Sequence, residues 1–332
     1  MKTELSIRSA TRLATLGVVL ASPLALVALP ASAAPVLDGM RDAVYGLRSV
    51  QTVQTQFGDA NPNGGSELDA AYAHVEGGTL YLMLTGNLES NFNRLNLFID
   101  SVAGGQNVLE NSTDSGGSNP TNDGWAAKHA GFTFDAGFFA DYMLSLRSGV
   151  FGTARFDADF SVIGGGANAF EAATAIFGNA LTGASASALP GAGIGIAFDN
   201  SNTGGVTGGT GAANAAAAAA VATGIELAIP LSAIGSPDPE DIRISAMING
   251  SNHDYLSNQF LGGLMPPQGN LGGDGAGAFN GTIGQINLQN ASYAAGNQFF
   301  TVAERTAVPE PATIALAGLA LAGMAGMRRR RS

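Results

Sequence analysis

The most regular feature of this chain is the alternation of apolar and polar residues in short runs. In Thr79–Thr85 the leucines fall on one face and Tyr81 and Met83 on the other. Further runs with this alternation are Arg94–Asp100, Tyr142–Arg147, Ile194–Phe198, Ile225–Ile229, Ile242–Ile248 and Gln298–Val302. Because residues two apart in a strand share a face, each run predicts a β-strand with at least one buried side.

Gly-Gly, Asn-Gly and Asp-Gly pairs separate these runs and favour hairpin turns. Together they predict an all-β protein, an antiparallel β-sandwich of the jelly-roll kind with Gly- and Ala-rich loop insertions. A short helix is expected around 170–177. The alanine run 215–220 is interpreted as part of an insertion, because six residues are too few for an isolated helix to be stable.

The two ends of the chain differ from this pattern. Lys2, Arg8 and Arg12 precede an uncharged apolar stretch, and Ala31 and Ala33 then supply the small residues that signal peptidase accepts. This order predicts a signal peptide over residues 1–33 and therefore an exported protein.

At the other end, Pro309, Glu310 and Pro311 precede an apolar run over 312–327, which the four arginines Arg328, Arg329, Arg330 and Arg331 close. Sixteen residues are fewer than the ~20 that span a bilayer without strain. The arginines favour the cytoplasmic side, so the run is expected to anchor the chain transiently in the inner membrane.

This three-part order, over 308–332, resembles the PEP-CTERM sorting domain. The resemblance implies that a membrane-embedded exosortase recognises the tail and removes it near the Pro-Glu-Pro motif. A plain membrane anchor is the alternative interpretation. In the sorting interpretation the prolines keep the cleavage region extended, because proline fixes φ and lacks an N–H. The expected destination is the cell surface or the extracellular matrix.

Without its two ends, the chain is a body, residues 34–307, with 8 basic and 24 acidic residues and a formal charge of −16. Such a charge disfavours binding to nucleic acid and attracts cations. The absence of cysteine excludes disulfides, thiol nucleophiles and cysteine-based metal sites.

The body is similar to DOMON-like and carbohydrate-binding-module-like sandwiches. The motifs that carry this similarity are, in order, Leu37–Gly39, Leu80–Gly86, Leu95–Asp100, Gly224–Leu231 and Asp241–Asn249. The similarity implies a sandwich fold over most of 36–303 and a ligand-binding role. The Ala/Gly insertions and the single tryptophan depart from the sugar-binding members.

One stretch matches the first half of a calcium-binding loop, with oxygen ligands at alternate positions and Gly64 at the turn. Its candidate ligands are Asp59, Asn61 and Asn63, with Glu67 and Asp69 in place of the missing glutamate at the twelfth position, which is Ala70. An ordinary Asn/Gly turn with Asx hydrogen bonds is the alternative. Calcium is the only cofactor that the sequence suggests.

Sugar-binding sites use aromatic faces as stacking platforms. Trp125 is the only tryptophan, and Tyr142 and Tyr255 could assist it. The alternative places Trp125 in the core.

No nucleophile elbow, phosphate-binding loop or zinc-protease motif occurs, and there are only three histidines. We therefore expect a non-catalytic protein of the surface or matrix, associated with exopolysaccharide. A carbohydrate-binding module for that polysaccharide is the second hypothesis. A secreted hydrolase with an unrecognised site is the third.

Overall fold

The computed structural model describes residues 33–58, 65–111, 124–164, 170–174, 177, 182–293 and 298–303. The chain divides into two units, 1–33 and 34–332, and every element described below belongs to the second. Residues 1–32 of the predicted signal peptide, with Ala31, lie outside the described residues, and so do Asp59, Asn61, Asn63 and the sorting tail; Ala33 is exposed.

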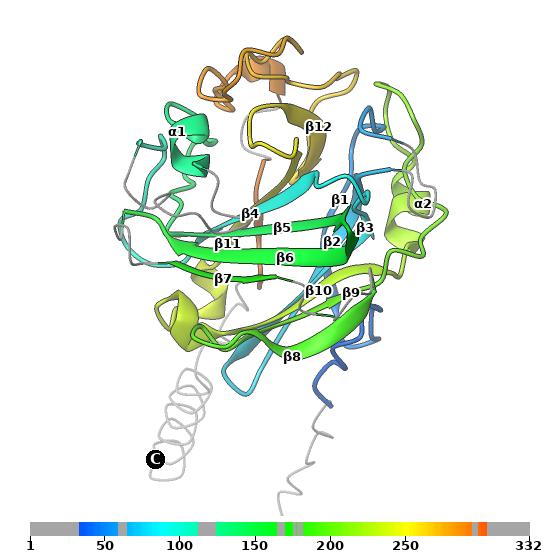
Figure 1. Ribbon diagram of the computed structural model, residues 1–332, viewed down its shortest axis with the longest axis vertical. Coiled ribbons are helices and arrows are strands. Elements are labelled where there is room, and N and C mark those ends of the chain that lie inside the picture. Colours follow the sequence, from blue (N-terminus) through cyan, green and yellow to red (C-terminus); the bar gives the residue numbers. More distant parts are fainter. Residues whose placement is uncertain are drawn as a thin grey trace, which may run out of the picture. The chain divides into compact units, whose positions relative to one another are not determined.

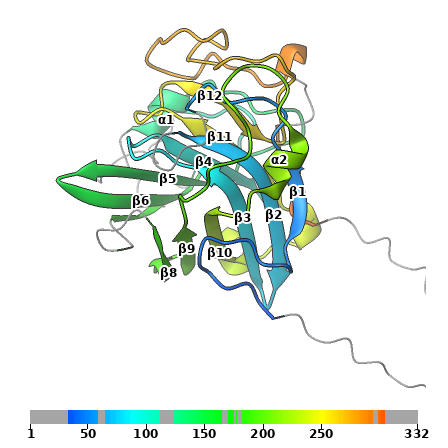
Figure 2. The ribbon, with the colours of Figure 1, turned by 90° about the vertical axis from the view of Figure 1, so that its right-hand side faces the viewer.

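Two antiparallel sheets form the body (Figures 1 and 2). The first sheet has the order β1 (Gly46–Val50), β2 (Glu67–Glu76), β3 (Thr79–Asn87), β10 (Gly224–Pro230), β9 (Ile194–Phe198), β8 (Gly183–Leu189). The second has the order β12 (Leu256–Leu261), β11 (Arg243–Asn249), β4 (Arg94–Asp100), β5 (Tyr142–Phe151), β6 (Thr153–Val162), β7 (Phe170–Thr174). A short strand, β13 (Phe300–Thr301), joins β12 on the edge of β11 that faces away from β4. The predicted β-sandwich is therefore confirmed.

The main core lies between the two sheets and is built from the predicted alternation. Leu80, Leu82 and Leu84 of β3 face Leu95, Leu97 and Ile99 of β4 in one apolar cluster, all of them buried. Each fully buried leucine or isoleucine side chain contributes roughly 1.5–3 kcal/mol of transfer free energy. The inner faces of the predicted strands thus account for the sandwich.

The outer face of the second sheet is covered as well. A second cluster joins Phe98, Met143 and Met247 of this sheet to α1 (Trp125–His129) and to apolar side chains between 132 and 293. Figure 1 shows α1 and the orange segment on the same side of β4 and β11. Within the described ranges, short 3₁₀ helices η2 (Leu231–Ile234), η3 (Pro239–Asp241) and η4 (Ala291–Tyr293) lie in the connections. The outward side chains Asn96, Phe98, Met143 and Met247 of the second sheet are therefore interior residues.

Residues 170–174, which were expected to lie in a short helix around 170–177, are a strand instead. Residues 170–174 form β7, which pairs with β6 from Asp157 to Ser161. Hydrogen bonding to an open sheet edge outweighs the weak helix preference of a five-residue segment.

The alanine run forms a helix, α2 (Ala215–Ala220), within its insertion. The Asn214 side chain accepts the amide hydrogens of Ala216 and Ala217 at 3.1 and 3.2 Å. At the other end, the Tyr72 hydroxyl and the Arg41 guanidinium donate to the Ala219 carbonyl at 2.7 and 3.0 Å. Tertiary partners at both ends stabilise a helix that would not form alone.

Candidate functional site

The two carboxylates predicted to complete a calcium loop lie at the start of β2. Glu67 pairs with Asn87, Leu68 pairs with Gly86, and Ala70 pairs with Thr85. Asp69 is therefore the extra residue of a β-bulge, and its carbonyl instead accepts the Gln51 amide at 2.7 Å. A bulge redirects the side chain that it carries.

Glu67 and Asp69 are both 0 % exposed, and the side-chain amide of Asn202 donates hydrogen bonds to both carboxylates. The Asn202 side chain donates to Glu67 Oε1 at 3.0 Å and to Asp69 Oδ2 at 3.2 Å. The Val206 amide donates to Asp69 Oδ1 at 2.8 Å. Gly205 allows this approach, because a Cβ there would lie 2.0 Å from Asp69 Oδ1. The loop 202–206 is thus fitted to the carboxylate pair.

Burial raises the pKa of Asp69 to about 7, although hydrogen bonds from Val206, Glu67 and Asn202 act in the opposite direction. Two carboxyl groups in hydrogen-bonding contact need either a shared proton or a nearby cation, because two buried negative charges repel each other. The pair can therefore hold a proton near neutral pH, or a cation in its place.

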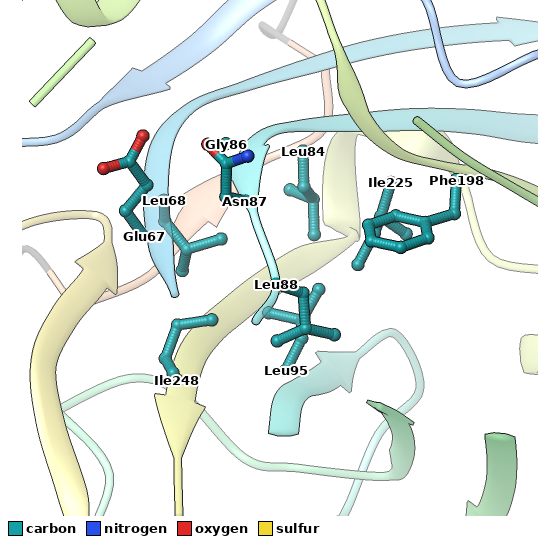
Figure 3. A pocket seen from close by; sticks show the side chains of 10 residues that line it. All are labelled: Glu67, Leu68, Leu84, Gly86, Asn87, Leu88, Leu95, Phe198, Ile225 and Ile248. Carbon is teal, nitrogen blue, oxygen red and sulfur yellow. The ribbon is translucent and has the colours of Figure 1, made fainter. Parts of the chain in front are cut away.

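Glu67 also lines a small cavity (Figure 3) with a volume of about 10 Å³. Figure 3 shows the Glu67 carboxylate turned away from the apolar side chains of Leu84, Leu88 and Ile225. A volume of this size holds about one water molecule. The cavity therefore has no room for an organic substrate.

The structure brings Glu67 and Asp69 together as the calcium hypothesis requires, while its other three ligands lie outside the described residues. Among the residues that are described, no three His, Asp or Glu side chains gather as a metal site. Calcium binding thus remains a prediction that depends on the segment 59–64.

A second buried carboxylate connects two of the motifs that suggested a DOMON-like body. Glu226 of β10 accepts the amides of Asp38 and Gly39 at 2.8 and 2.9 Å and the Tyr45 hydroxyl at 2.6 Å. Burial raises the pKa of Glu226, and these three hydrogen bonds lower it. Burial and the adjacent carboxylate raise the pKa of Tyr45. Glu226 thus fastens the N-terminal segment of the body to β10, a positioning role.

The three aromatic residues proposed for sugar binding do not form one site. Trp125 is 2 % exposed and packs in the outer cluster, so it offers no stacking face to solvent. Tyr142 packs on the inter-sheet core, on the opposite side of the sheet, and its ring stacks on Phe160. Tyr255 stacks on Phe57 at a centroid distance of 6.0 Å, and its hydroxyl donates to the Gly277 carbonyl. The core alternative for Trp125 is therefore correct.

Sequence reasoning missed a buried polar cluster on the outer face of β4. The Asn96 amide nitrogen lies 3.2 Å from His129 Nε2 and 3.4 Å from His253 Nδ1. His129 Nδ1 lies 2.8 Å from the Trp125 carbonyl, so Nδ1 carries the proton and Nε2 accepts from Asn96. All three side chains are 0 % exposed. The available signal was an asparagine at an outward strand position between two apolar neighbours.

Comparison with known proteins identifies the tail. Residues 307–331 match the PEP-CTERM protein-sorting motif, which agrees with the predicted span 308–332. No curated protein and no solved structure matches the chain. The DOMON-like resemblance of the body therefore has only its short motifs as support.

The PEP-CTERM motif implies an exported protein that an exosortase processes and that is sorted to the cell surface. Within the described part of the chain, no helix has both the length and the apolar character to cross a bilayer.

Proposed function

We propose that this protein is a non-catalytic component of the cell surface or extracellular matrix, released from its tail by exosortase and associated with exopolysaccharide. The observation that carries the proposal is the PEP-CTERM motif at 307–331 behind a body of two antiparallel sheets. Signal peptidase is the proposed partner at the other end, and the tail anchors the chain transiently in the inner membrane.

The non-catalytic part of the proposal rests on sequence and geometry together. The chain has none of the catalytic motifs considered above. Glycosidases hold two carboxyl groups ~5–9.5 Å apart across an open cleft. Glu67 and Asp69 instead contact one another beneath the surface, and Glu67 alone of the two lines a cavity of about 10 Å³. The carboxylate pair described here therefore favours a structural role over hydrolysis.

A carbohydrate-binding role is the second candidate, and one observation favours it. The β5–β6 hairpin carries an open hollow with aromatic and guanidinium groups in its wall. These are the side chains that protein sites use for sugar rings and acidic groups. Calcium, if it binds at Asp59–Asp69, has a structural role in this proposal.

The sorting proposal is tested by the fate of the tail. Glu310→Ala and deletion of 312–332 should each move the protein out of the surface and matrix fraction, because each removes a part of the matched motif. Fractionation followed by immunoblotting measures the distribution. Glu304→Ala is the matched control, since it removes a glutamate six residues before Glu310 and outside 307–331. Normal surface delivery of both tail variants would contradict the proposal.

A further inference from the structure

The β5–β6 hairpin projects from the sandwich on the side opposite β1–β3 (Figure 2). Near its tip lies a hollow of about 250 Å³, and its wall is formed by Phe92, Arg147, Phe151 and Arg155. Ligand pockets for larger organic molecules measure ~300–1,000 Å³. The hollow is therefore of a size for a single sugar ring.

One wall of the hollow is held in place by backbone geometry. Phe92 has a positive φ of 70°, and its amide donates to the Ser148 carbonyl at 2.8 Å. Its ring lies against Gly149, where a Cβ would approach within 2.3 Å of a ring carbon. The Arg147 guanidinium lies 5.1 Å from the centre of the same ring. The position of the Phe92 ring is thus set before any ligand arrives.

The other wall carries charge. Asp157 has a side chain that is 0 % exposed, and it accepts Arg147 Nε at 2.8 Å and Arg155 Nη2 at 2.9 Å. Two guanidinium groups therefore share one buried carboxylate, and the three side chains together carry one net positive charge. The four residues that form the wall include no acid. Because Asp157 orders both arginines, little side-chain entropy remains to be lost on binding an anion.

This local charge contrasts with the chain as a whole, which has a formal charge of −11. At physiological ionic strength, charges more than ~8 Å away are largely screened. An acidic group inside the hollow therefore interacts mainly with the one net positive charge that Arg147, Arg155 and Asp157 carry together. The overall negative charge would slow the approach of a polyanion at low salt, and this effect is itself measurable.

Phe151 gives the hollow an apolar face, and this exposed side chain does not contribute to the buried core of the fold. It is 79 % exposed at the hairpin tip, and its neighbour Val150 is 55 % exposed. Aromatic rings stack against the C–H face of sugars, and guanidinium groups recognise carboxylate and sulfate through paired hydrogen bonds. The hollow thus combines an aromatic face, which suits a sugar ring, with two guanidinium groups, which suit an acid. This combination fits a sugar that carries an acidic group.

We propose that the hollow formed by Phe92, Arg147, Phe151 and Arg155 binds an anionic sugar unit of an extracellular polysaccharide. This inference rests on the proposed location of the protein outside the cell and deepens the carbohydrate-binding candidate. The acidic group lies against the two arginines, and the apolar face of the ring lies against Phe151.

Titration of the exported, processed protein with polygalacturonate and with dextran sulfate tests the proposal, with uncharged dextran as the reference polymer. Binding to either acidic polymer and not to dextran is expected, and the preferred polymer identifies the acidic group as carboxylate or sulfate. Phe151→Ala should weaken binding about fivefold through lost stacking. Arg155→Gln should weaken it about tenfold or more, because hydrogen bonds to charged groups are stronger than neutral ones.

Matched controls separate the site from general surface effects. Phe279→Ala removes another exposed phenylalanine, 66 % exposed, and Arg48→Gln removes a positive charge from β1 in the other sheet. Both should bind like the wild type, and thermal melts should show that every variant is folded. Equal binding by Phe151→Ala, Arg155→Gln and the controls would overturn the proposal.

Two further outcomes would also overturn it. One is association of the wild type with neutral lipid vesicles through Phe151, without binding to acidic polymers, which would make the hairpin tip a membrane contact. The other is tail-dependent surface delivery without polymer binding, in which the sorting proposal stands and the hollow fails. Polymer binding without tail-dependent delivery supports the hollow and contradicts the sorting proposal.

Discussion

The two faces of strand β4 are equally buried but differ in chemistry. Leu95, Leu97 and Ile99 point into the core between the sheets, whereas Arg94 and Asn96 point outward, and all five are 0 % exposed. The outward side chains are interior only because α1 and the segments between 132 and 293 cover them. Their polar groups therefore need partners inside the protein.

This contrast shows that burial alone does not determine residue chemistry. The inner face is stabilised by non-directional apolar contact, which tolerates similar residues of similar volume. The polar positions of the outer face, beside the apolar Phe98, depend on directional hydrogen bonds, which fail when one partner is removed. Arg94 illustrates the second case, since its Nε donates to the Ser251 carbonyl at 2.8 Å. The predictions below test the two faces from the largest expected effect to the smallest.

The largest effect is expected on the inner face. Leu97→Ala should lower the free energy of unfolding by about 2–5 kcal/mol, because it removes buried methyl groups and leaves a cavity between the sheets. Urea denaturation followed by circular dichroism measures the change. Val150→Ala, at a position 55 % exposed, is the control and should change stability by less than about 0.5 kcal/mol. Similar losses for both variants would show that the inter-sheet core does not dominate stability.

The outer face is tested at Asn96, whose side-chain amide contacts both His129 and His253. Asn96→Ala should lower the free energy of unfolding by about 2 kcal/mol, because His129 Nε2 and His253 Nδ1 lose their common donor. The same denaturation experiment measures this loss. Asn252→Ala, an exposed asparagine beside His253, serves as the control. A loss no greater than that of the control would mean that the polar cluster contributes nothing.

The carboxylate pair gives a pH dependence of defined sign. The pKa of Asp69 is raised to about 7 in the folded protein, so its contribution to stability is greatest near pH 4 and is lost as pH rises through 7. In Glu67→Gln the new amide can donate to Asp69 while its oxygen still accepts from Asn202. The variant should match the wild type at pH 4 and exceed it by about 2 kcal/mol at pH 8.

Stability measured across this pH range in urea provides the readout. Glu76→Gln, which changes a carboxylate at the far end of the same strand, is the control. Parallel curves for the wild type and Glu67→Gln would contradict a proton shared between Glu67 and Asp69.

The smallest effect is expected from calcium. An ion that binds only the folded state at tenfold excess over its Kd adds about 1.4 kcal/mol. Millimolar calcium should therefore raise Tm by several degrees, more at pH 8 than at pH 5, because protons compete for the carboxylates. Asp59→Ala should remove most of the gain, and magnesium should give less, since it requires a tighter octahedral site. Equal stabilisation by both cations would indicate charge screening only.

The strands with clean alternation could be predicted from sequence, and Arg94–Asp100 was predicted with the bounds of β4. β2 was not predicted from the sequence. It is rich in alanine, which has little strand preference, and the bulge at Asp69 shifts the alternation of its apolar residues. β6 was not predicted, although Phe156, Ala158 and Phe160 alternate with Asp157 and Asp159 at the period of a strand. Acidic side chains at those positions are compatible with a buried strand only when cover and partners exist.

The sequence by itself determined the sorting tail and the inner faces of the strands with clean alternation. Both are local patterns, one a linear motif read in order and the other a period of two along each strand. The tertiary structure alone decided the outer faces and the carboxylate pair with Asn202. These sites join residues up to 157 positions apart, and hydrogen bonds across such distances leave no periodic trace in the chain.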